Sequence, residues 1–161
     1  MEELLYKTYY ESPAGLIEIM ANDTGVTSIL FVRKRAGRSQ NNEHTTECAR
    51  QLHDYFNKER KTFSIPLDLQ GTDFQKRVWN ELLNIPFGKT ISYLQLATIL
   101  GDKKSIRAVG GANGRNPVSI IIPCHRVIGS NGDMVGYGGG LDKKKFLLEL
   151  EGVLVQQELF S

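Results

Sequence analysis

Side chains alternate between apolar and polar over residues 5–32, and two short runs interrupt the alternation at 12–15 (Ser-Pro-Ala-Gly) and 22–25 (Asn-Asp-Thr-Gly). A period of two places alternate side chains on opposite faces of a strand. Runs of Pro, Gly, Asn and Asp favour the tight turns that join neighbouring strands. The pattern therefore predicts a three-stranded antiparallel meander with one buried face.

A different pattern follows the predicted sheet. The polar, basic stretch from Arg33 to Asn42 indicates a linker whose charges face solvent. Thr46 to Phe56 has apolar residues at helical spacing, and an extended segment from Phe63 to Leu69 comes next. The composition changes near Gly71, so we expect two domains, residues 1–70 and 71–161.

The second domain begins as helices. Thr72 is a suitable N-cap for a helix that carries Val78, Trp79 and Leu82. Further on, a short helix over 94–100 is stopped by a Gly-Asp pair at 101–102, and a second helix is expected over 103–112. Two short helices joined by a glycine-containing turn are typical of a helix-turn-helix.

The remainder of the chain carries a cysteine between apolar segments. An apolar run over 118–122 is expected to be extended, a glycine-dense loop spans 129–140, and a final helix is expected over 142–151 with Gly152 as its stop. Together the elements predict an α+β fold. It comprises a small N-terminal lobe of antiparallel sheet plus helix, then a mainly helical domain with a helix-turn-helix and a cysteine-containing strand or loop.

Composition restricts the classes of protein to consider. The 161 residues are 40% hydrophobic and 24% charged, and the sequence has neither a membrane-spanning run nor a signal peptide at Met1, so a cytoplasmic protein is expected. Cys48 and Cys124 lie in different local contexts, which argues against a disulfide and leaves room for a reactive thiol. The net charge of +2 means that any affinity for nucleic acid must come from local clusters of charge.

Cys124 and His125 are the candidate reactive pair. Neighbouring residues on an extended strand point to opposite faces, so the two side chains cannot simply pair. Either the backbone bends sharply after Pro123, or a water molecule connects the thiol to the imidazole, which still lets His125 act as a base. The alternative is that Cys124 is a small buried apolar residue and His125 a hydrogen-bonded core histidine.

The string around this cysteine, Ile-Pro-Cys-His-Arg-Val-Ile at 122–128, closely resembles the active-site signature of the O6-alkylguanine-DNA alkyltransferases. The resemblance also includes Phe-Gly-Lys-Thr-Ile-Ser-Tyr at 87–93, Arg-Ala-Val-Gly-Gly-Ala at 107–112, Asn-Pro at 116–117, Val-Gly-Tyr-Gly-Gly-Gly-Leu at 135–141 and Glu-Gly at 151–152. It is nearly continuous from Phe74 to Gly152, in the family's order and spacing. Residues 1–70 resemble the family in architecture alone, as a ribonuclease-H-like lobe.

The resemblance implies a methylated-DNA–protein-cysteine S-methyltransferase that repairs O6-alkylguanine, and O4-alkylthymine, in one irreversible turnover. Cys124 would take the alkyl group, and His125 would accept the thiol proton through a water. Glu151 would orient His125 and stabilise its charge. Asn116 would act as a hinge before the cysteine segment, and Tyr93 would donate a hydrogen bond to the departing guanine.

The resemblance also implies how DNA is bound. Because the target carbon lies inside the duplex, the nucleotide must be extruded, and Arg107 would fill the gap from a helix in the minor groove. A phosphate contact is the alternative role for Arg107. Other residues expected to contact DNA or the flipped base are Ala108, Gly110, Ala112, Arg115, Val127, Met134, Val135, Gly136, Tyr137 and Gly138, with Lys89, Lys103 and Lys104 adding positive charge. Gly138 departs from the family, since many members have serine there, so a side-chain hydrogen bond to the lesion oxygen is lost.

The expected partner is double-stranded DNA that bears an alkylated guanine, and the protein is expected to be a monomer, independent of membranes and cofactors. It would act on the nucleoid in a prokaryote. Some family members hold zinc in the N-terminal lobe, but His44, Cys48 and His53 are too few and wrongly placed for a thiolate-rich site, so we expect no metal.

Two other functions share parts of this pattern. A DNA-binding module without enzymatic activity needs a helix-turn-helix but no thiol after proline, and the related alkyltransferase-like proteins replace the acceptor cysteine. A cysteine hydrolase would turn over repeatedly on acyl substrates, whereas an alkyl thioether is not hydrolysed. A burst of product equal to the protein concentration separates alkyl transfer from hydrolysis.

Overall fold

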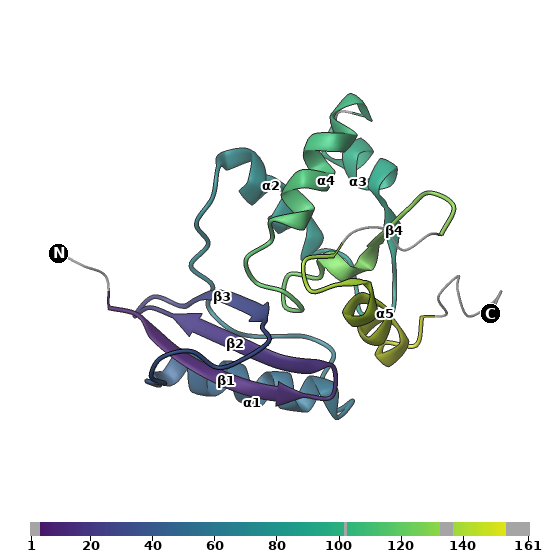
Figure 1. The fold of residues 1–161 in the computed structure, drawn as a ribbon. Helices are drawn as coiled ribbons and strands as arrows, with labels where there is room; N and C mark the ends of the chain where they lie inside the picture. The colour runs from purple at the N-terminus through teal and green to yellow at the C-terminus, as the bar shows by residue number, and fades with distance from the viewer. Residues whose placement is uncertain (1–3, 102, 133–136, 154–161) are drawn as a thin grey trace. The chain divides into compact units, whose positions relative to one another are not determined.

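The computed structural model describes residues 4–101, 103–132 and 137–153. The chain forms two compact units that divide between Gln70 and Gly71, and each is considered separately (Figure 1). The α+β class predicted from the sequence is confirmed. No helix of the described residues is long and apolar enough to cross a membrane.

The first unit contains the predicted meander. Strands β1 (Tyr6–Ser12), β2 (Gly15–Ala21) and β3 (Val26–Phe31) pair antiparallel in the order β1-β2-β3. The alternation has its expected effect, because Ile17, Ile19 and Ala21 on β2 are fully buried. The turn signals therefore predicted both the strands and their pairing.

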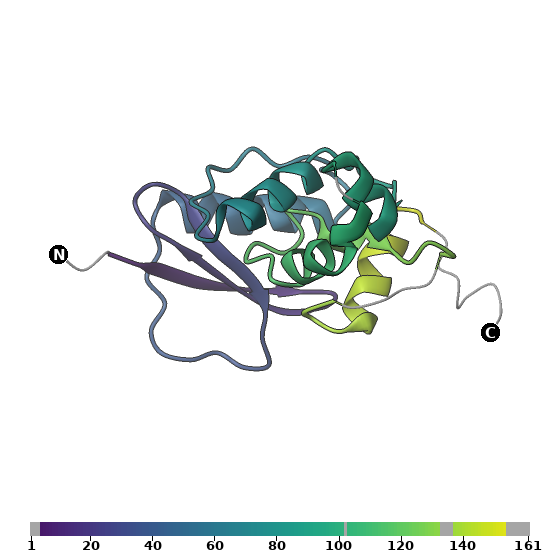
Figure 2. The ribbon, with the colours of Figure 1, turned by 90° about the horizontal axis from the view of Figure 1, so that it is seen from above.

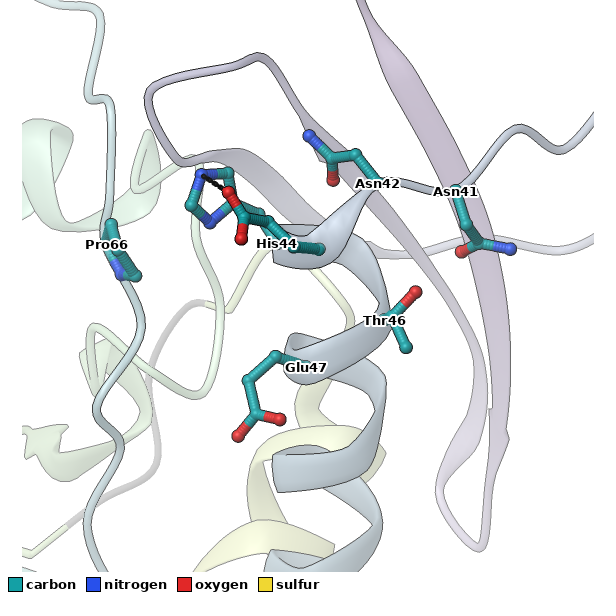
Figure 3. A pocket seen from close by; sticks show the side chains of 7 residues that line it. Asn41, Asn42, His44, Thr46, Glu47 and Pro66 are labelled. Carbon is teal, nitrogen blue, oxygen red and sulfur yellow. Dashed lines mark ion pairs between the residues drawn. The ribbon is translucent and has the colours of Figure 1, made fainter.

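Helix α1 (Glu43–Phe56) packs on β1 and β2 through its apolar side chains, among them Leu52 and Tyr55 (Figure 1). It begins three residues before the predicted start. The reason is a capping box, in which the Asn42 side chain accepts from the Thr45 amide at 2.9 Å and the Thr45 hydroxyl accepts from the Asn42 amide at 3.0 Å. A hollow of about 620 Å³ lies beside this end of α1 (Figure 3).

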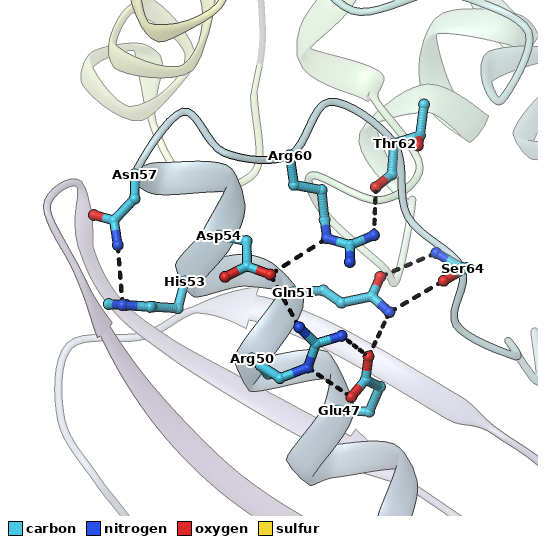
Figure 4. Close-up of polar contacts among 9 residues, drawn as sticks. All are labelled: Glu47, Arg50, Gln51, His53, Asp54, Asn57, Arg60, Thr62 and Ser64. Atoms are coloured by element: carbon cyan, nitrogen blue, oxygen red, sulfur yellow. Dashed lines mark hydrogen bonds and ion pairs between the residues drawn. The ribbon is translucent and has the colours of Figure 1, made fainter.

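Polar side chains on the outer face of α1 are linked in a network (Figure 4). Arg50 pairs with Glu47 and, at 3.1 Å, with Asp54, which also lies 3.7 Å from Arg60. The hydrogen bond from Arg50 is the main cause that lowers the pKa of Glu47 to about 2. These pairs remain partly accessible to solvent, so they add little stability.

The second unit is mostly helical. Helix α2 (Asp73–Leu82) is capped by Thr72 as predicted, and the pair α3 (Tyr93–Ile99) and α4 (Ile106–Gly114) lies side by side as a helix-turn-helix (Figures 1 and 2). The second helix was expected from residue 103, but Lys103–Ser105 forms a separate 3-10 turn, η1, before α4. Helix α5 (Leu141–Leu150) completes the unit.

The apolar run over 118–122 is not extended, contrary to the prediction. It folds into turns, with bonds from the Ile121 amide to the Ser119 carbonyl at 2.9 Å and from the Ile122 amide to the Val118 carbonyl at 3.0 Å. Ile120 has a φ of 74°, a conformation that β-branched residues rarely adopt. The run is almost fully buried, and its apolar character reflects that burial rather than strand formation.

The cysteine segment is connected to the helix-turn-helix by a short parallel pairing. Strand β4 (Ile91–Ser92) runs directly into α3, and strand β5 (Val127–Ile128) follows the cysteine; Ile91 pairs with Val127 and Ser92 with Ile128. The 3-10 turn η2 (Cys124–Arg126) directly precedes β5. The pairing places the start of α3 next to the segment that carries Cys124.

Trp79 anchors α2 to α4, and its removal tests how far the second unit depends on this contact. The ring is 2% exposed and its Nε1 donates to the Ala112 carbonyl at 2.8 Å. Trp79→Ala should lower the free energy of unfolding by about 3–5 kcal/mol, because it leaves a cavity and an unpaired carbonyl. Urea denaturation followed by far-UV circular dichroism measures it. Trp79→Phe keeps an aromatic ring and should lower the free energy of unfolding by less. Equal losses in the two variants would mean that the cavity is not the cause.

Candidate active site

Cys124 lies at the first position of η2 and is 6% exposed. Burial raises the pKa of its thiol, while a hydrogen bond from the Asn116 side chain and the positive charge of Lys144 act in the opposite direction. The resting thiol is thus held in its neutral form in a site that already contains groups favouring the anion. A reactive thiolate requires such groups.

His125 is fully buried beside it in sequence. Its Nε2 lies 2.7 Å from Oε2 of Glu151, and because a carboxylate only accepts, Nε2 carries the proton. Nδ1 therefore bears the lone pair, and it is buried without a hydrogen-bond partner in the described part of the chain. Burial lowers the pKa of His125 more than Glu151 raises it, so the ring is neutral and able to accept a proton.

The sharp bend considered as an alternative in the sequence is present. Cys124 to Arg126 form a 3-10 turn, with the Cys124 amide donating to the Ile122 carbonyl at 2.8 Å and the Arg126 amide to the Pro123 carbonyl at 2.9 Å. Neighbouring side chains in a tight helical turn do not point to opposite faces as they do on a strand. The bend and a bridging water are therefore compatible.

Glu151 caps the C-terminus of α5 and is 6% exposed. Its Oε1 accepts from Arg126 Nε at 2.8 Å and from the Gly88 amide at 3.1 Å, and its Oε2 accepts from His125 and, at 3.0 Å, from a second Arg126 nitrogen. Burial would raise the pKa of Glu151, but the bonds and charges of His125 and Arg126 outweigh it and hold the pKa below its usual range. The carboxylate stays ionised at neutral pH.

Arg126 was not among the sequence-predicted site residues. Besides its two bonds to Glu151, it donates to the Ile85 carbonyl at 2.6 Å and lies over the Phe87 ring at 5.9 Å. It is 6% exposed, so both charges of the Arg126–Glu151 pair are shielded from water. Its place directly after Cys-His in the motif was the available signal.

Asn116 and Tyr93 flank the cysteine segment from two different places, just after the end of α4 and at the start of α3. Asn116 donates to the Ile122 carbonyl at 2.7 Å and accepts from the Val118 amide at 2.9 Å, which ties the two ends of the turn-rich run together. Tyr93 opens α3, where its hydroxyl lies 3.4 Å from the side-chain nitrogen of Asn113. Burial raises the pKa of Tyr93, so the phenol keeps its proton.

Lys144 is a second residue that the sequence reasoning missed. It lies on α5, is fully buried, and donates to the Val127 carbonyl at 2.7 Å. In the sequence it is the middle of three consecutive lysines, which resembles a solvated face. The useful signal was helical spacing, because Leu147, Leu148 and Glu151 follow at three, four and seven residues and share its face.

The residues predicted to contact DNA or the flipped base differ in exposure. Arg107, Ala108 and Arg115 are exposed, Gly110 is half-buried, and Ala112 faces the interior, 3% exposed. The side chain of Val127 is fully buried, and its carbonyl accepts a hydrogen bond from Lys144. The outward residues of α4 can approach a large ligand.

The glycine-dense loop is described in part. Met134, Val135 and Gly136 lie outside the described residues. Tyr137 is largely buried, and burial together with the charge of Cys124 raises its pKa well above the usual value. Gly138 is exposed, and among the described residues a Cβ added there would meet the Gly114 carbonyl, at 4.0 Å. A serine would therefore fit at this position.

The chemistry available to this arrangement is nucleophilic attack by sulfur assisted by a buried base. The described residues include no group of three or more His, Cys, Asp or Glu side chains that could hold a metal ion. Cys48, in the first unit, is fully buried, and burial raises its pKa to about 12, which leaves it unreactive.

Comparison with known proteins covers nearly the whole chain. Residues 73–153 match the family model "6-O-methylguanine DNA methyltransferase, DNA binding domain", and residues 5–69 match its "ribonuclease-like domain". Methylated-DNA–protein-cysteine methyltransferases from Mycobacterium bovis and Methanosarcina acetivorans are 56% and 45% identical, over 91% and 92% of this chain and 91% and 99% of their own lengths.

The fold of the chain is also similar to that of a solved structure. The crystal structure of the Mycobacterium tuberculosis OGT in complex with DNA matches with a TM-score of 0.81 and 41% identity, and the match covers 95% of this chain and 98% of that one. The chain therefore belongs to the 6-O-methylguanine DNA methyltransferase family.

Proposed function

We propose that this protein repairs O6-alkylguanine in double-stranded DNA by transferring the alkyl group to Cys124, once per molecule and without a cofactor. The observation that carries the proposal is the buried pair of His125 and Glu151. The pair directs a basic, hydrogen-bond-deficient Nδ1 into the interior, next in sequence to the thiol. Most buried polar atoms are hydrogen-bonded, and Nδ1 is placed to accept a bond from the bridging water that the relay requires.

The proton path follows from the tautomer of His125. Nε2 donates to the ionised Glu151, so Nδ1 can take the Cys124 proton through a bridging water and the imidazolium is stabilised by the carboxylate. Arg126 keeps the carboxylate ionised and oriented throughout. Asn116 donates to the sulfur and so favours the thiolate over the thiol.

The thiolate then attacks the alkyl carbon. A carbon–sulfur bond forms as the bond between that carbon and the guanine oxygen breaks, and the electron pair leaves with the guanine. The neutral phenol of Tyr93 donates a hydrogen bond to the departing base, which disperses its negative charge. Because a thioether has no acyl group for water to attack, Cys124 is not regenerated, and a hydrolase cycle is disfavoured.

The helix-turn-helix presents the duplex to this site. The exposed small residues of α4 allow close approach to the sugar-phosphate walls, and Arg107 occupies the space left by the flipped nucleotide. Gly138 leaves room for large alkyl groups, and O4-alkylthymine is the second expected lesion. The protein acts as a monomer, and in a prokaryote its place of action is the nucleoid.

Alkylation should appear as one added methylene mapped to Cys124. Incubation with a duplex that contains O6-methylguanine, followed by intact-mass and peptide analysis, measures this directly. Cys124→Ser should abolish transfer but leave DNA affinity largely unchanged, and Cys48→Ser should behave as wild type. Continued turnover at fixed protein concentration, or a methyl group on Cys48, would contradict the proposal.

The relay requires an ionised Glu151, and stability measured against pH tests that state. The pKa of Glu151 in the folded chain lies below its ordinary value, so its stabilising effect is present above the unfolded pKa of about 4.3 and is lost as pH falls towards the folded pKa. At about pH 7, Glu151→Gln should lose about 3–5 kcal/mol because Arg126 stays buried without its counter-charge. Below about pH 4 the difference in stability between wild type and Glu151→Gln should shrink, because the wild-type carboxylate begins to be protonated on unfolding. Exposed Glu149→Gln is the matched control, and a loss independent of pH would mean that Glu151 is not ionised.

Arg107→Ala separates base extrusion from chemistry. If Arg107 fills the vacated space, repair of duplex DNA should slow by at least about ten-fold more than reaction with free O6-benzylguanine, which needs no extrusion. Single-turnover rates on both substrates measure the ratio. Arg115→Ala is the comparison for a phosphate contact, which would instead weaken all DNA binding and make its salt dependence shallower by about one unit. Equal slowing on both substrates would remove Arg107 from either role.

A further inference from the structure

Lys144 is fully buried, whereas the other lysines of the second unit are half-buried or exposed. Its neighbours on α5, Lys143 and Lys145, are partly exposed and form ion pairs with Asp142 at 3.1 Å and Glu149 at 3.8 Å. Burying an ammonium group is costly unless polar or charged groups offset the loss of water. An uncharged side chain would fill the same place at lower cost, so the charge itself calls for an explanation.

The contacts of the ammonium group include one with β5 and one with α3. Nζ donates to the Val127 carbonyl at 2.7 Å and lies 6.0 Å from the centre of the Tyr93 ring, the outer limit of a cation–π contact. These contacts join α5 to the strand that follows Cys124 and to the first residue of α3. The ammonium is thus placed among the three segments that surround the thiol.

The charge of Lys144 is coupled to the charge of Cys124. Burial lowers the pKa of Lys144 to about 8, and an ionised Cys124 raises it again. The interaction is mutual, since the lysine charge lowers the pKa of the thiol. Opposite charges in a site shielded from water attract strongly, so each group favours the ionised form of the other.

The other ionisable groups around the sulfur do not supply this positive charge. The phenols of Tyr93 and Tyr137 are kept neutral by burial, and burial also keeps His125 neutral. The charge of Arg126 is engaged by both oxygens of Glu151. Among the described residues, Lys144 is the one whose charge lowers the pKa of the Cys124 thiol.

We propose that Lys144 is a positioning residue of the alkyl-acceptor site, which favours the ionised form of Cys124 by its charge and holds the Val127 carbonyl against β5. The proposal deepens the proposed function and rests on its assignment of Cys124 as the nucleophile. Proton transfer to His125 and attraction to Lys144 are separate contributions. The histidine accepts the proton, and the lysine stabilises the charge that remains on sulfur.

The test is the pH dependence of the rate at which iodoacetamide alkylates Cys124. All variants also carry Cys48→Ala, so that alkylation of Cys124 alone is measured. Lys144→Met keeps the length of the side chain and removes its charge. In Lys144→Met the pH midpoint of Cys124 alkylation should rise by at least about one pH unit, and the alkylation rate at about pH 7 should fall about ten-fold. Lys144→Arg, which keeps the charge, should retain a midpoint nearer to wild type. Lys145→Met, on the exposed side of the same helix, should match wild type.

A purely structural role predicts a different result. Lys144→Met would then lower the thermal midpoint of unfolding but leave the pH midpoint of alkylation unchanged, and that outcome would overturn the proposal. If Lys144→Met does not fold, the coupling is measured from the other side, by NMR titration of the Lys144 Nζ in wild type and in Cys124→Ser. Reciprocity requires a lower midpoint for Lys144 in Cys124→Ser. An unchanged midpoint would also overturn the proposal.

Failure of this proposal is distinguishable from failure of the proposed function. Iodoacetamide needs neither DNA nor base extrusion, so it reports on the thiol alone. If wild type gains no methyl group from O6-methylguanine DNA while Lys144→Met still shifts the alkylation midpoint, the proposed function fails and the charge coupling stands. If methyl transfer occurs and the midpoint does not move, the coupling fails and the function stands.

Discussion

The Glu151 carboxylate is the interaction on which the second unit's active site depends. The carboxylate accepts three hydrogen bonds from His125 and Arg126 of η2 and one from the amide of Gly88. The residue that carries it is the C-cap of α5. A buried carboxylate is tolerated only when it is so fully bonded. One group therefore sets the tautomer of the histidine, neutralises the arginine, and joins α5 to the loop before the helix-turn-helix.

The groups around Cys124 act on its ionisation in opposite directions, since burial raises the pKa of the thiol while Asn116 and Lys144 lower it. Burial keeps Cys124, His125 and Tyr93 in their neutral forms. Arg126 and Glu151 compensate each other, and the charge of Lys144 acts on the sulfur. Under the proposed single-turnover reaction, a neutral resting thiol limits side reactions, because a permanently ionised thiol reacts more readily with small electrophiles.

Local patterns account for most of the fold and for the core of the candidate site. Alternation and turn residues predicted the sheet, and the Thr72 cap predicted the start of α2, because both are governed by residues close in sequence. The motif around Cys124 supplied His125, and its resemblance to a family supplied Glu151 and Asn116. The apolar run at 118–122 was mistaken for a strand, since burial selects the same residues whatever the backbone conformation.

The sequence by itself determined the helix-turn-helix and identified the candidate nucleophile and its neighbouring candidate base, because these are carried by contiguous residues. Only the tertiary structure decided which charges act on them. Nothing local distinguishes Lys144 from the lysines on either side of it, and Arg126 is named by no pattern as the partner of Glu151. Their roles arise from burial, which removes competing water, and from the folding of α5 against η2 and β5, which joins residues that are distant in sequence.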